Sequence, residues 1–248
     1  YVFTSCIFMI AALTVRAGVE VISRMFTLIV LMTGLSISAV IVLGIANYKP
    51  DLLLPVLPDG IKPVLHGAVF SFGFPYAEVF LVAMLLPFVN EKGTSRLNRI
   101  MVITLALNII TLCLSTLCTL MTFGQSAGER PYALYSLARI VEFQEIVTRI
   151  ESVIGMTLIL GSYMKTTVTL YVLSLYVTQL FQLNDYRKFV MPLAMLGFLA
   201  TLVSFNGAAE WGEIVGTYHP VWATAAFVIP LLLLTIVARF KKSSGQTS

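Results

Sequence analysis

The stretch SFGFPYAEVF, residues 71–80, decides how this chain has to be read, because it interrupts a long apolar run. Pro75 lacks a backbone donor and its ring clashes with the preceding turn of a helix, and Gly73 adds flexibility. A proline also disfavours helical backbone at the residue before it, so we predict an extended or irregular Phe74. Glu78 places a carboxyl group just beyond this point. The stretch therefore predicts a span that is broken near its middle.

The composition around this stretch is that of an integral membrane protein. Hydrophobic residues make up 58% of the chain and charged residues 11%, whereas about a quarter of the residues in soluble domains are charged. The mean hydropathy is +0.92. The net charge of +4 comes from basic residues in short clusters between apolar runs, which favours membrane topology over nucleic-acid binding. We therefore expect the protein to lie in a lipid bilayer and not to bind nucleic acid.

Several segments are long and apolar enough to cross a membrane as helices, which takes about 20 residues. Their apolar runs are continuous and lack the alternation of barrel strands. The fold class is therefore all-α transmembrane. The seven predicted spans cover residues 2–17, 25–46, 66–89, 100–123, 150–178, 189–206 and 220–239.

The connections between the spans differ in character. Residues 48–65 are rich in proline and contain an Asp-Gly step, which predicts an ordered, turn-rich external loop. Residues 131–147 begin with a proline suited to the first helical position and repeat apolar residues at helical spacing, which predicts an amphipathic helix across the external mouth. A solvated surface helix without a gating role is the alternative. Residues 206–220 read as an interfacial connection that carries Trp211.

Basic residues predict the orientation. With the amino end outside, ten lysines and arginines fall on the cytoplasmic side, five fall on the external side and Lys165 is left inside a span. Cytoplasmic loops carry the excess of positive charge in membrane proteins. The tail, residues 241–248, is then cytoplasmic.

Two ionisable residues, Glu78 and Lys165, fall near the middle of predicted spans. A charge there costs at least about 2.5 to 3.5 kcal/mol, so such residues face a cavity or a partner. Lys165 could pair with a carboxylate, hold a broken helix or replace a coupling cation; alternatively, its long side chain reaches the membrane surface. Glu78 is a protonatable acid near the midplane, as proton-coupled membrane proteins need. Alternatively, it is a structural acid that caps a helix end.

The backbone break favours a transporter-type site over an ordinary proline kink. Unpaired backbone at membrane depth is tolerated only where protein or a water-lined cavity satisfies it. Secondary transporters use such interrupted helices to hold a substrate near the midplane. Glu78, one turn beyond Pro75, strengthens this interpretation.

The motifs of common enzyme and metal sites are absent from the sequence. It has no Walker loop, HExxH, GxSxG or calcium-binding loop, and the three cysteines lie in apolar runs without metal-ligand spacing. His66 and His219 flank spans, where a solvated or capping histidine is the simplest interpretation. We therefore expect no enzyme, no cofactor and no metal site.

Longer stretches resemble the B subunits of spore germination receptors (GerAB type). Residues 130–167, RPYALYSLARIVEFQEIVTRIESVIGMTLILGSYMKTT, are similar to the external helix and following span of that family, including the R-I-E step of Arg149, Ile150 and Glu151. Residues 54–88 resemble its loop and broken span. Residues 16–25, RAGVEVISRM, resemble its turn between two earlier spans.

This resemblance implies a fold of the amino acid/polyamine/organocation (APC, LeuT-like) superfamily, with ten spans in two inverted repeats. The seven spans present would be the fourth to the tenth, on an amino-terminally truncated chain. Residues 1–47 would be the last two spans of the first repeat, and residues 66–240 the complete second repeat. The broken first span, which forms the other half of the superfamily site, would be missing.

The resemblance also implies a function in the spore inner membrane or cell membrane. The B subunit recognises a small nutrient such as an amino acid and triggers germination together with an A subunit and a lipoprotein C subunit. Gly73, Phe74, Pro75 and Glu78 would then bind the ligand. Lys165, Arg149 and Glu151 would be coupling or structural charges.

Two other functions use the same features. A proton-coupled amino acid permease of the APC superfamily would have the same cavity and would move its ligand. Seven spans with the amino end outside are also the arrangement of seven-helix receptors and retinal proteins, in which Lys165 would be a Schiff-base lysine. That reading places the lysine in the fifth span instead of the last.

Overall fold

The computed structural model describes residues 2–55, 60–88, 94–130, 132–140, 150–204 and 207–244, which are helices and short connections without a strand. The chain divides into two compact units. Unit 1 comprises Tyr1–Val56 and Val89–Gly197, and unit 2 comprises Leu57–Phe88 and Phe198–Ser248. The all-α prediction is confirmed, whereas the division into two inverted repeats stays a prediction.

The elements of each unit are as follows. Unit 1 contains α1 (Val2–Ala17), α2 (Val19–Leu43), η1 (Gly44–Asn47), η2 (Pro50–Leu53), α4 (Thr94–Phe123), η6 (Gly124–Glu129), α5 (Ala133–Ile140), α6 (Ile150–Leu180) and most of α7 (Arg187–Ser204). Unit 2 contains α3 (Lys62–Ser71), η3 (Phe72–Tyr76), η4 (Ala77–Phe88), the end of α7, α8 (Ala208–Ala223), η7 (Thr224–Val228) and α9 (Ile229–Ser244).

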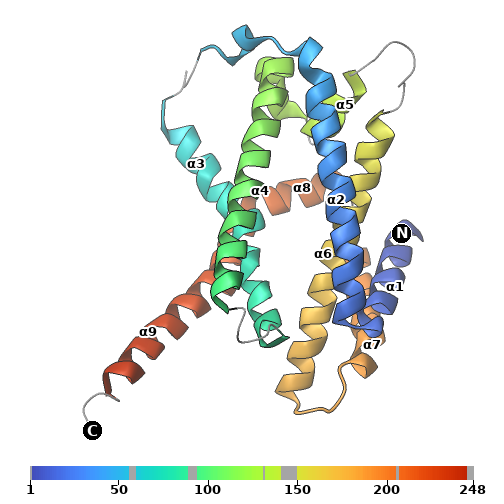
Figure 1. Cartoon of the computed structure of the whole chain (residues 1–248), viewed down its shortest axis with the longest axis vertical. Helices are drawn as coiled ribbons and strands as arrows, with labels where there is room; N and C mark the ends of the chain where they lie inside the picture. Colours follow the sequence, from blue (N-terminus) through green and yellow to red (C-terminus); the bar gives the residue numbers. More distant parts are fainter. Residues whose placement is uncertain are drawn as a thin grey trace. The chain divides into compact units, whose positions relative to one another are not determined.

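Unit 1 is built on α1, α2 and α6, which pack against one another (Figure 1). Ala11, Ile29 and Tyr163, one from each helix, form a buried cluster. Thr14 and Tyr163 share a buried hydrogen bond of 2.7 Å between their hydroxyl oxygens, which ties α1 to α6. In a membrane such polar contacts and close packing hold helices together, because lipid provides no hydrophobic drive.

A second cluster in unit 1 joins α2, α4, α5 and α6 through Val40, Cys118, Leu137, Ala138 and Ile154. One of these helices, over Ala133–Ile140, lies within the range 131–147 for which the sequence predicts an amphipathic helix. Because Leu137 and Ala138 are buried, this helix packs against its neighbours and is not a solvated surface helix. Residues 141–149 lie outside the described part of the chain.

Within the part of the chain that the structure describes, five helical stretches are long and apolar enough to span a membrane, and Val2–Ala17 is apolar but shorter. Large apolar side chains such as Leu28, Leu107 and Leu232 are exposed along them, as expected for a surface that faces lipid. The chain is therefore an integral, multi-pass membrane protein. The five stretches are Val19–Asn47, Arg96–Glu129, Glu151–Leu180, Arg187–Ser204 and Thr217–Val237.

Two predicted connections differ from the structure. The turn expected around residues 16–25 is confined to Gly18, whose φ of 104° suits glycine, and α2 begins at Val19. Residues 206–220, predicted as a connection between spans, instead contain most of the helix α8 (Ala208–Ala223), whereas their place at the membrane interface stays a prediction. Glutamate, tryptophan and tyrosine suit an exposed helix as well as a loop, so polarity alone could not distinguish the two.

Candidate ligand-binding site

The broken span lies in unit 2 and changes its helical type twice. It runs as an α-helix to Ser71, as a π-helix over Phe72–Tyr76 and as a 3₁₀-helix over Ala77–Phe88. The predicted interruption is therefore present, and Phe74, predicted to be extended or irregular, lies in a π turn and is not extended. A π turn is wider than an α turn and can accommodate a proline without leaving the helical region.

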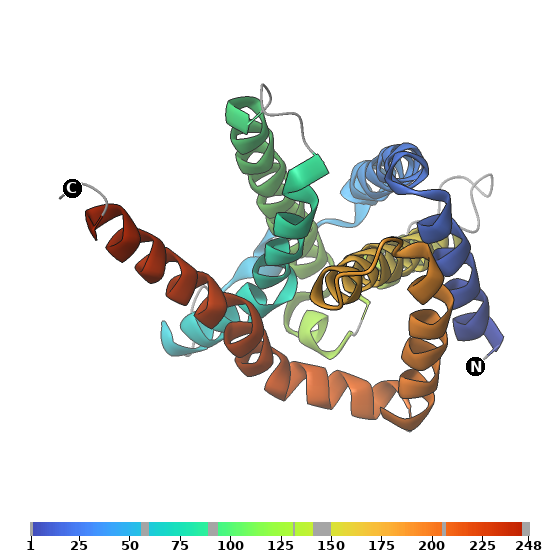
Figure 2. The same cartoon turned by 90° about the horizontal axis from the view of Figure 1, so that it is seen from below.

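A second interrupted helix packs against the first within unit 2. α8 contains Pro220, continues as the π-helix Thr224–Val228 and then as α9. Figure 2 shows the change of direction between α8 and α9. α8 contacts α3 and η3, and η7 contacts η4. Two irregular backbones thus meet at the same place.

Gly73 forms the crossing point of these two helices. A Cβ atom at Gly73 would lie 2.9 Å from Pro220 Cα, 3.3 Å from Pro220 N and 3.4 Å from His219 Nδ1. Real Cβ atoms do not approach backbone this closely, so the crossing needs a residue without a side chain. The glycine predicted as a point of flexibility is therefore also a packing requirement.

Glu78 lies close to His219 of α8. The distance between Glu78 Oε1 and His219 Nε2 is 3.6 Å, and the two side chains are 20% and 26% exposed. This distance exceeds that of a hydrogen bond, so the contact is one of charge when the imidazole is protonated. The surroundings are apolar: Ala77 and Ala223 are buried, and the rings of Phe80 and Phe227 lie 6.0 Å apart.

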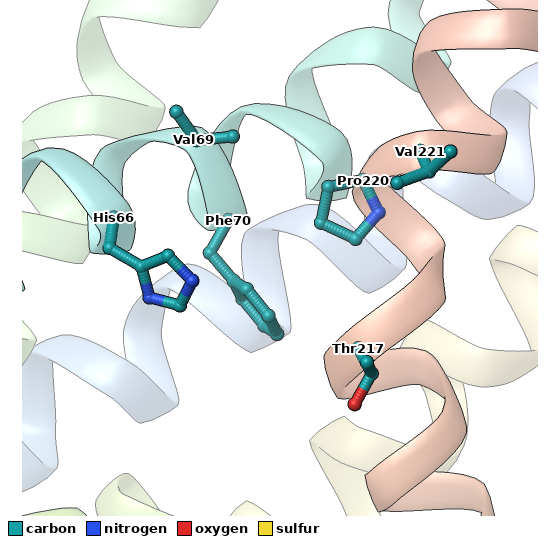
Figure 3. A pocket seen from close by; sticks show the side chains of 6 residues that line it. All are labelled: His66, Val69, Phe70, Thr217, Pro220 and Val221. Atoms are coloured by element: carbon teal, nitrogen blue, oxygen red, sulfur yellow. The ribbon is translucent and has the colours of Figure 1, made fainter.

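An open groove of about 290 Å³ lies between α3 and α8. In Figure 3, His66 and Phe70 project from α3 towards the side on which Thr217 of α8 lies. Small-molecule sites usually occupy about 300 to 1,000 Å³ and combine apolar walls with a few polar groups. The groove is thus small, with polar groups from His66 and Thr217. Its remaining lining residues are Val69, Phe70, Pro220 and Val221.

The other predicted site residues fall in different places. Arg149 and the side chains of Phe74 and Pro75 lie outside the described part of the structure. Glu151 is half-buried in the first turn of α6, and Lys165 is exposed on α6, both in unit 1.

The sequence does not identify His219 as a site residue, because a histidine that flanks a span is more simply interpreted as solvated or capping. The structure instead places it beside Glu78. One signal was present in the sequence, because His219 lies inside the apolar stretch Thr217–Val237. An ionisable side chain in such a stretch normally has a partner.

The chain is similar to known spore germination proteins. The model of a family described as "Spore germination protein" matches residues 1–208. Spore germination protein KB of Bacillus subtilis (strain 168) is 23% identical over 256 residues, which cover 100% of this chain and 67% of that protein. No solved structure matches. The chain belongs to the spore germination protein family.

Proposed function

We propose that the chain is the membrane-embedded subunit of a nutrient germinant receptor, which recognises a small nutrient such as an amino acid and triggers germination. The observation that carries this proposal is a half-buried carboxyl group, Glu78, beside an interrupted helix in a member of the spore germination family. Placing a carboxyl group within an apolar span costs free energy, so residues of this kind are usually retained because they serve a function.

The geometry supports a site for a small polar molecule. Glu78 can pair with a cationic group such as an ammonium. The groove between α3 and α8 offers room for an apolar side chain, and its lining residue Pro220 follows His219, the neighbour of Glu78, in the chain. Gly73, Phe74 and Pro75 contribute the irregular backbone at this level. Binding triggers a change only if the ligand has different affinities for two conformations of the receptor.

The proposal also includes the partners, membrane and orientation of the protein. The protein acts with A and C subunits in the spore inner membrane or cell membrane, with a cytoplasmic carboxyl terminus, and is not an enzyme. Lys165, Arg149 and Glu151 are coupling or structural charges.

A proton-coupled amino acid permease is the second candidate, favoured by the two interrupted helices η3 and η7. Helices of this kind hold substrates in secondary transporters. Uptake of labelled amino acids into vesicles separates the two functions. Accumulation driven by a proton gradient would establish a permease and contradict a pure sensor.

The germinant dose response of Glu78→Gln in the full-length protein tests the proposed function. We expect the half-maximal concentration to rise at least about tenfold, because the loss of one charged contact to a ligand costs about 1.4 kcal/mol or more. The amount of protein in the membrane, measured by immunoblot, should not change. A wild-type dose response would contradict a ligand site at Glu78.

A further inference from the structure

We propose that His219 is the positioning residue for Glu78, and that this pair links the broken span α3–η3–η4 to the second interrupted helix, α8–η7–α9. The inference rests on the proposed function in one respect, because it assigns Glu78 as the residue that meets the ligand. Its geometric part is independent of that assignment.

The pair lies in a place where charges interact strongly. Both side chains are mostly buried, and their nearest polar atoms are 3.6 Å apart. Attraction between an imidazolium and a carboxylate grows as the surroundings become less polar. When the imidazole is protonated, His219 therefore favours the orientation in which the Glu78 carboxylate points towards α8.

Two contacts keep the distance between Glu78 and His219 short. The crossing of Gly73 with Pro220 precedes Glu78 along the broken span and directly follows His219 along α8. The ring contact of Phe80 with Phe227 lies beyond Glu78 and connects η4 to η7. The two helices thus approach each other on both sides of Glu78, so that the pair responds to any change in their spacing.

Other ionisable groups on the helices that pack around the pair have different surroundings. His66 lies one helix turn before Phe70, with its ring 6.3 Å from that of Phe70. Tyr218, next to His219, is exposed. The remaining groups on α3, η3 and α8 are Lys62, Tyr76, Glu210 and Glu213. His66 is therefore a matched control for the contact of His219 with Glu78.

Through the contact between Glu78 and His219, ligand binding at the broken span can change the position of the carboxyl-terminal helices. A ligand that brings a cationic group to Glu78 meets a carboxylate that His219 already orients, and its charge joins the contact between the broken span and α8. η7 and α9 follow α8 in the chain. The ligand class that fits is a small molecule with an ammonium or similar cation.

A cadmium bridge tests the geometry in membranes. Glu78→Cys is introduced into the full-length protein after its native cysteines, which include Cys6, Cys113 and Cys118, have been replaced. Thiolate and imidazole together bind soft divalent metals. Cd²⁺ should therefore protect the introduced thiol from maleimide labelling. Protection should need at least about tenfold more Cd²⁺ after His219→Asn or His219→Gln, and be unchanged after His66→Asn.

Germination assays with a mixture of the common amino acids test the positioning role. His219→Asn should raise the half-maximal concentration several-fold with little change in the maximal response, and Tyr218→Phe should behave as wild type. The exchange of Glu78→His with His219→Glu should restore part of the loss, which a merely structural role would not produce.

The outcomes separate the two proposals. Cadmium protection that is the same without His219 would overturn the inference, whatever Glu78 does. Protection that depends on His219, together with a wild-type dose response of His219→Asn, would overturn the positioning role. A wild-type response of Glu78→Gln with His219-dependent protection would instead contradict the proposed function and leave the interhelical pair in place.

Discussion

Gly73 and Pro220 approach so closely that a methyl group on Gly73 would lie 2.9 Å from the Cα atom of Pro220. The atom in the way belongs to the backbone of α8, which cannot turn aside as a flexible side chain could. The crossing of the two interrupted helices therefore depends on the missing side chain at position 73, and this crossing brings Glu78 close to His219.

The first prediction concerns this crossing. Gly73→Ala should destabilise the protein by about 1 to 3 kcal/mol, because an extra methyl group in a packed contact forces the backbone apart. For a protein of this size that lowers Tm by a few °C, measured on the purified full-length protein in detergent. Gly67→Ala is the matched control, since a Cβ atom there meets nothing within 4 Å. Equal Tm values would contradict the close crossing.

The second prediction concerns the groove between α3 and α8. Val221→Trp adds a large ring to a lining residue and should occupy part of the 290 Å³ volume. The half-maximal germinant concentration should then rise at least about tenfold through loss of ligand space. Val203→Trp, at the strongly exposed end of α7, serves as the control. If both variants respond alike, the ligand does not occupy this groove.

The third prediction concerns the buried hydrogen bond between Thr14 and Tyr163. A double-mutant cycle of Thr14→Val and Tyr163→Phe should give a coupling energy between about 0.6 kcal/mol, the average for hydrogen bonds between membrane helices, and about 1.7 kcal/mol, their maximum. The free energy of unfolding in mixed micelles provides the measurement. The exposed hydroxyl of Thr166 donates to the Ser162 carbonyl within the same helix, so Thr166→Val should show no coupling with Thr14→Val.

The fourth prediction concerns Lys165. Lys165→Met in the full-length protein should reduce the germinant response without loss of protein from the membrane. A lysine in an apolar span costs free energy, and such residues are usually retained because they serve binding or coupling. Lys165→Arg should retain more of the response, since it keeps the charge. Dose responses of both variants provide the measurement. Wild-type behaviour of Lys165→Met would remove this residue from the proposed coupling charges.

Sequence alone predicted most of the helices, because the length of an apolar run can be read from the sequence and the bilayer thickness sets the length that a span needs. The interruption near Gly73 and Pro75 was predicted for the same reason, since backbone restrictions act between neighbouring residues. Residues 206–220 were predicted as a connection, but most of them form α8. A polar sequence can form either a helix or a loop, and here the helix packs against η3.

The sequence by itself thus determined an all-α membrane protein with a broken span and an acidic residue beside the break. Only the tertiary structure decided that His219 lies beside Glu78 and that Gly73 serves a close crossing. The physical reason is that such contacts depend on where two helices cross. Their apolar surfaces allow many crossings, and the close approach of backbone to backbone at one glycine selects among them.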